Sequence, residues 1–117
     1  MKANPVLLSK EVERILSEHK GLNVKKIDLK NKSSIADFMI ICSGTSSRHV
    51  ISLSNHLLKS LKKKSLKTLN VEGKSNGDWV LVDAGDIIIH LFKSEVRDYY
   101  SLDQMWENNN LNKVYEK

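Results

Sequence analysis

The stretch CSGTSS, residues 42–47, is the first place in this sequence where side chains and backbone could do chemistry. It follows an apolar run and precedes a helical pattern, so free backbone amides and a helix dipole would meet there and could receive a phosphate. A P-loop, however, ends in Lys-Ser or Lys-Thr, and a dinucleotide loop needs three spaced glycines. Neither pattern is present, so phosphate binding is not the favoured interpretation.

A Gly-Ser turn in this position also occurs in nucleotidyltransferases, whose metal chemistry needs carboxylates that converge from adjacent strands. The nearest candidates, Asp83 and Asp86, lie on opposite sides of a predicted hairpin bend and are better explained as turn formers. We therefore expect no catalytic residue, no metal and no cofactor, and we predict that the protein is not an enzyme.

Three histidines and one cysteine are the remaining candidates for chemistry. His49 and His56 lie seven residues apart, whereas metal pairs on a helix are spaced by three or four, so both are predicted to face solvent or a partner. His90 lies in the apolar run IIIHLF and is interpreted as a histidine at the edge of the core, because no nucleophile has a defined position beside it. Cys42 is predicted to be buried and unreactive.

The elements that must position these residues follow from apolar periodicity, which predicts the order α-β-β-α-β-β-β-α. The first half of the chain is predicted to form a helix from Asn4 and Pro5 to a left-handed stop at Gly21, an edge or near-edge strand over 23–30, and a strand over 35–44. A helix capped by Thr45 or Ser46 follows, then a short strand over 69–73, a hairpin of strands 79–82 and 87–92, and one or two helices over 94–106. This order predicts an α/β (α+β) fold, a single mixed five-stranded sheet with helices packed on it and at least one parallel pair.

The strand 87–92 is apolar on both faces, so both faces must be covered. We expect the first two helices to cover one face and part of the other to be kept for a partner. The alternative is that two copies of the chain pair through this apolar hairpin and form a homodimer.

Size, composition and charge narrow the class of protein. A chain of 117 residues is predicted to form one domain over 1–107 with a mobile tail over 108–117. No stretch resembles a signal peptide or a membrane span, so we expect a cytoplasmic protein. The net charge of +5 favours anionic partners, and five lysines lie within 59–67. The favoured explanation for them is a solvated helix end, with a dedicated RNA site as the alternative.

Three stretches in the order SSIADFMIICSGTSSRHV (33–50), WVLVDAGDIIIHLF (79–92) and RDYYSLDQMW (97–106) resemble the ribosomal silencing factor family, RsfS, also called Iojap. The resemblance implies a nucleotidyltransferase-like sheet that has lost its metal carboxylates. It also implies a factor that binds the large ribosomal subunit through its protein fourteen, blocks joining of the small subunit by steric occlusion and represses translation, with any contact to ribosomal RNA secondary. The sequence departs from the family pattern at Ala84, usually aromatic, and at Ser94, often proline.

By motif position, the family's shared surface residues are Asp37, Ser43, Arg48, Trp79, Asp86, His90, Arg97, Tyr100 and Trp106. Trp79 and the acidic side chains Asp86, Glu95 and Asp98 are expected to contact a basic ribosomal protein, because aromatic residues dominate interface energetics. Tyr100 and Trp106 are expected to pack the last helix onto the sheet. The candidate partner-binding residues are Trp79, Asp86, Glu95, Asp98, Arg48, His90 and Tyr100.

Two other functions compete with this one. A small RNA-binding module acting through the lysine-rich end of the second helix predicts salt-dependent binding to naked RNA. Replacing Lys62, Lys63 and Lys64 by Ala would then abolish ribosome association, whereas silencing predicts only a modest loss. A cryptic nucleotidyltransferase predicts heat of binding with nucleoside triphosphates and Mg²⁺.

Overall fold

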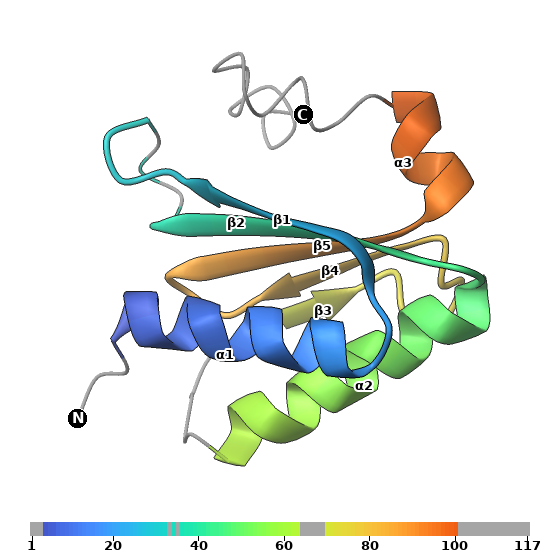
Figure 1. Ribbon diagram of the computed structural model, residues 1–117, viewed down its shortest axis with the longest axis horizontal. Helices are drawn as coiled ribbons and strands as arrows, with labels where there is room; N and C mark the ends of the chain where they lie inside the picture. Colours follow the sequence, from blue (N-terminus) through green and yellow to red (C-terminus); the bar gives the residue numbers. More distant parts are fainter. Residues whose placement is uncertain (1–3, 33, 35, 64–69, 101–117) are drawn as a thin grey trace.

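The structure, a computed structural model, describes residues 4–32, 34, 36–63 and 70–100 (Figure 1). Its elements are α1 (Pro5–Glu18), β1 (Leu22–Asp28), β2 (Phe38–Gly44), α2 (Ser47–Lys63), β3 (Asn70–Glu72), β4 (Trp79–Asp83), β5 (Ile87–Lys93) and α3 (Ser94–Tyr100). This is the order predicted from the sequence. The domain boundary predicted at 107, the tail over 108–117 and Trp106 lie outside the described residues. Within the described part, no helix is long and apolar enough to cross a membrane.

The five strands form one mixed sheet in the order β1-β2-β5-β4-β3. The central pair, β2 and β5, is parallel and runs in register from Phe38 opposite Ile87 to Gly44 opposite Lys93. The other three pairings are antiparallel. The predicted mixed five-stranded sheet is confirmed, and so is the edge position of the strand that begins near residue 23.

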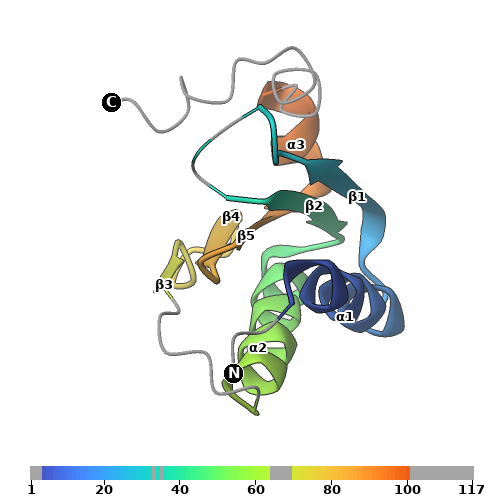
Figure 2. The same cartoon turned by 90° about the vertical axis from the view of Figure 1, so that its left-hand side faces the viewer.

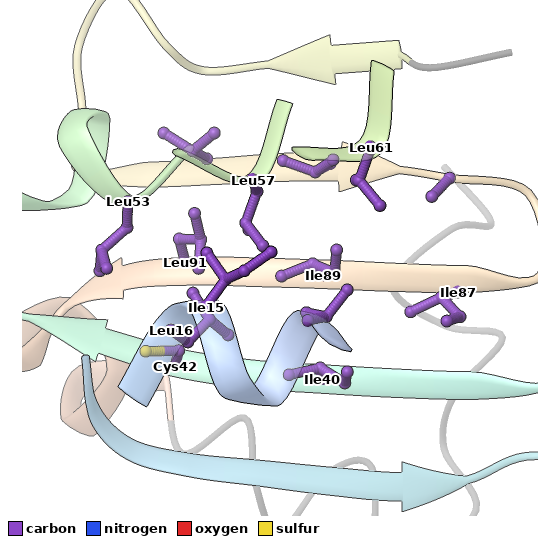
Figure 3. Packing of buried hydrophobic residues seen from close by; sticks show 14 of the residues in the cluster. Ile15, Leu16, Ile40, Cys42, Leu53, Leu57, Leu61, Ile87, Ile89 and Leu91 are labelled. Atoms are coloured by element: carbon purple, nitrogen blue, oxygen red, sulfur yellow. The ribbon is translucent and has the colours of Figure 1, made fainter. Parts of the chain in front are cut away.

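Helices α1 and α2 cover one face of the sheet, and α3 lies on the opposite side (Figures 1 and 2). The first face carries the larger core, because the apolar stripes of both helices meet alternate side chains of the strands. Figure 3 shows this packing around Leu53, Leu57, Ile89 and Leu91. Strand β5 is buried on its other face too, where Ile88 and Phe92 join a second core cluster.

Local signals explain where α1 begins and where it ends. The Asn4 side chain accepts hydrogen bonds from the amides of Val6 and Leu7, as expected of an N-cap. The predicted left-handed stop at Gly21 is wrong, because Lys20 takes this conformation instead, with φ of 66°. Gly21 is needed for space: a Cβ there would lie 2.5 Å from the Cys42 sulfur.

Candidate partner-binding site

The polar side chains in the turn that leads into α2 form hydrogen bonds with other residues of the same chain. Ser46 is the N-cap, because its hydroxyl accepts from the His49 amide at 3.1 Å. His49 Nδ1 accepts from the Thr45 amide at 2.9 Å, so the neutral ring carries its proton on Nε2, which lies 2.9 Å from the His19 carbonyl oxygen and donates to it. The Ser47 hydroxyl donates to Asp78 at 3.0 Å, so a carboxylate of this chain lies beside the first turn of α2.

Histidines 19, 49 and 56 join the C-terminal end of α1 to α2. His56 stacks on His19 with ring centroids 3.5 Å apart and planes 8° from parallel. Desolvation, His19 and Lys59 each lower the pKa of His56. Both histidines are partly exposed, and both also contact His19, the residue that directly follows α1. Sequence spacing could not show this, because the contact depends on how two helices pack.

The acidic bend between β4 and β5 is built as a turn. Asp83 accepts a hydrogen bond from the Gly85 amide at 2.9 Å, which confirms its interpretation as a turn former. Asp86 is exposed, and its backbone carbonyl accepts from the amides of Asp37 and Phe38 at the start of β2. Among the described residues, no three His, Cys, Asp or Glu side chains are placed to hold a metal ion.

The single cysteine is fully buried, as predicted. Its sulfur lies in β2 against α1, within the larger core (Figure 3). Burial raises the pKa of the Cys42 thiol to about 11, so the reactive thiolate is scarce at neutral pH.

Three rings gather where β4 and β5 pair on the face opposite α1 and α2. Trp79 lies opposite Phe92, and His90 is the diagonal neighbour of Trp79 on the same face. The indole Nε1–H of Trp79 donates to His90 Nδ1 at 2.9 Å, and the Trp79 and Phe92 ring centroids lie 4.9 Å apart. His90 is only 1% exposed, whereas Trp79 is half-buried. His90 therefore positions the Trp79 ring and is itself out of a partner's reach.

The protonation state of His90 matters to this arrangement. Burial lowers its pKa to about 3, so the ring is neutral at physiological pH and Nδ1 can accept the indole hydrogen. Protonation would place a charge in the core and remove that acceptor.

A charged group lies next to Trp79 along the backbone. Lys93 forms ion pairs with Asp78 at 3.4 Å and with Glu95 at 3.1 Å, and the Glu95 side chain is 77% exposed. Asp78 directly precedes Trp79 in the chain. We call Asp78, Trp79, Lys93 and Glu95 the Trp79 surface.

The seven candidate partner-binding residues are only partly brought together. Trp79, His90 and Glu95 lie at the same end of the sheet, and exposed Arg48 is next to Ser47, which contacts Asp78. Asp86 lies at the opposite end of β5, roughly 20 Å away by the rise of a strand. Asp98 and Tyr100 are on α3, but their side chains lie outside the described part.

Two residues mapped from the family pattern are structural. Ser43 is 1% exposed and Arg97 is 8% exposed. Arg97 Nη1 donates to the Asn23 carbonyl at 2.7 Å and lies 3.0 Å from the Ser43 hydroxyl, so it fastens α3 to β1 and β2. The sequence interpretation did not single out Asp78, which contacts Ser47 and Lys93. No local pattern indicates its contacts, since they come from α2 and β5.

Comparison with known proteins shows which family this chain resembles. The family model described as "Ribosomal silencing factor during starvation" matches residues 2–117. A ribosomal silencing factor RsfS of Zymomonas mobilis is 46% identical over 103 residues, which cover 88% of this chain and 77% of that protein. The mouse protein named mitochondrial assembly of ribosomal large subunit protein 1 is 33% identical, and the match covers 79% of this chain and 42% of that protein.

Among solved structures, a crystal structure of a protein from Chromobacterium violaceum superposes with a TM-score of 0.85 at 33% identity, covering 90% of this chain and 88% of that one. Fold and surface together define a small α+β protein with two helices on one face of its sheet and an aromatic group on the other. The chain belongs to the ribosomal silencing factor family, RsfS.

Proposed function

We propose that this protein is a cytoplasmic ribosomal silencing factor. It binds the large ribosomal subunit through ribosomal protein fourteen, occupies the surface that meets the small subunit, and represses translation by preventing subunit joining. No bond is made or broken, so the protein needs a complementary interface and no catalytic residue. Its family membership and the names of its relatives support the ribosomal target.

The observation that carries the proposal is the Trp79 surface. A half-buried indole is fixed by a hydrogen bond to a buried histidine, and an exposed carboxylate, Glu95, lies at the same end of the sheet. Rigid aromatic anchors of this kind supply much of the energy of protein interfaces, because their ring position is set before binding. Glu95, Asp98 and Tyr100 on α3 extend this contact. Asp86 lies at the other end of β5, and we propose that it makes a separate, peripheral contact.

The direct test is a subunit-joining experiment. Purified small and large subunits are mixed with and without the protein and separated on a sucrose gradient. We expect the protein to migrate with the large subunit and to reduce the joined particle in proportion to its occupancy. Joining that proceeds unchanged, with the protein at the top of the gradient, would contradict the proposal.

Replacing Trp79 by Ala should raise the dissociation constant for the large subunit tenfold or more, since a central aromatic anchor is worth about 2 kcal/mol. Cosedimentation measures binding, and circular dichroism checks that the fold is retained. Leu7→Ala is the matched control, because Leu7 is 64% exposed and lies on α1, on the other side of the sheet. Equal binding by both variants would place the docking site elsewhere.

A further inference from the structure

Helix α2 carries two opposite stripes of side chains. The buried stripe packs on the sheet and consists of Val50, Leu53, Ser54, Leu57 and Leu61. The outer stripe follows the spacing four, three, four, three and consists of Arg48, Ser52, Asn55, Lys59 and Lys62, with Lys63 beside it. At 1.5 Å per residue, this α2 stripe forms a straight line of about 21 Å. Its members are cations and short hydrogen-bond donors.

The positive charge of the α2 stripe is not neutralised within the described part of the chain. No Asp or Glu occurs in the sequence between Asp37 and Glu72, and Arg48, Lys59, Lys62 and Lys63 form no ion pair with a described carboxylate. Helix α1 shows the ordinary alternative. Its Arg14 lies 2.6 Å from both Glu11 and Glu18 on the helix surface.

The helix dipole explains only part of this pattern. Lys62 and Lys63 are in the last turn, where cations are stabilised by the negative end of the helix. Arg48 is in the first turn, where a cation is disfavoured, and that turn contains no acidic residue. A solvated helix end therefore does not account for the whole stripe.

We propose that the α2 stripe binds the sugar-phosphate backbone of RNA. Nucleic-acid backbones are held mainly by Arg and Lys together with Ser and Asn side chains, which is the composition of this stripe. An acidic protein partner fits less well, because interface cores are apolar and aromatic, whereas the outer stripe contains neither kind of residue. A membrane surface is also disfavoured, since the apolar side of α2 is buried against the sheet. The inference adds a second contact to the proposed function and does not depend on it.

The test uses a fluorescently labelled RNA hairpin of about 20 nucleotides and the full chain. Affinity is measured by anisotropy between about 50 and about 200 mM KCl, where each phosphate contact contributes roughly 0.7 to 0.9 to the slope of log affinity against log salt. The variant Arg48→Gln/Lys59→Gln/Lys62→Gln should lower this slope by about 2 to 3. The control Lys10→Gln/Lys32→Gln/Lys74→Gln removes the same charge away from α2 and should leave the slope close to that of the wild type.

Each other outcome counts against the proposal. Equal slopes for the wild type and the α2 variant would overturn it, as would equal losses in the two triple variants, which would indicate a net-charge effect. Displacement of the RNA by polyglutamate at the same charge concentration would favour an acidic protein instead. Because free RNA is the probe, a wild-type protein that binds no RNA but still blocks subunit joining overturns the RNA contact alone. Intact RNA binding without any subunit binding overturns only the proposed function.

Discussion

The unfolding free energy is expected to fall by about 3 kcal/mol between pH 7 and pH 4 because of His90 alone. Burial lowers the pKa of this histidine to about 3, whereas the unfolded chain has the ordinary value of 6.5. Below pH 6.5 the unfolded state therefore binds more protons than the folded state. The stabilising contribution of neutral His90 is complete above pH 6.5 and is lost as the pH falls toward 3. The lowered pKa of His56 acts in the same direction.

Urea unfolding followed by circular dichroism at pH 7, 5.5 and 4 measures this dependence. His90→Gln keeps an acceptor for the Trp79 indole but does not titrate, so its stability should change by about 3 kcal/mol less over the same range. His56→Gln is the control, since it removes a histidine from the helix surface and should leave most of the acid loss in place. A His90→Gln protein with the wild-type pH dependence would show that another group causes it.

Arg97→Met is expected to cost about 2 to 4 kcal/mol, because it leaves one buried and one partly buried acceptor without their donor. The Asn23 carbonyl and the Ser43 hydroxyl both contact this guanidinium. Helix α3 has only seven residues, and a helix this short does not form without tertiary contacts. We therefore expect α3 to detach from the sheet and large-subunit binding to weaken with it.

Hydrogen exchange of the α3 amides and urea unfolding test this expectation together. Arg48→Met makes the same chemical change at an exposed position and should alter stability by no more than about 0.5 kcal/mol. Arg97→Lys keeps the positive charge and can still donate a hydrogen bond to one of the two acceptors, so it should recover part of the lost stability. Normal exchange protection of α3 in Arg97→Met would mean that other contacts hold the helix.

Helices and strands could be predicted from the sequence because their signals are local. The spacing of Val50, Leu53, Leu57 and Leu61 marks the buried stripe of α2, and the structure buries all four. The parallel neighbour of β2 could not be predicted. Its partner is β5 rather than the strands that follow α2 directly, and strand pairing over such a separation leaves no pattern in either segment.

For the candidate site, too, some features could be predicted from the sequence and others could not. Alternation along β5 places His90 on one face, and the hairpin register places it near Trp79, but neither shows that its ring is buried. Arg97 matched a surface residue of the family pattern, yet it points into the structure because α3 folds back over Ser43. Depth and direction are properties of the packed molecule, so residue type and spacing alone do not determine them.

The parallel pairing of β2 with β5 also has a consequence for how the chain folds. Phe38 pairs with Ile87, and about two fifths of the chain lies between them. The middle of the sheet therefore cannot assemble during synthesis until Lys93 has left the exit tunnel, and closing so long a loop slows folding. A nascent chain shorter than this should lack a stable core and be an easy substrate for proteases.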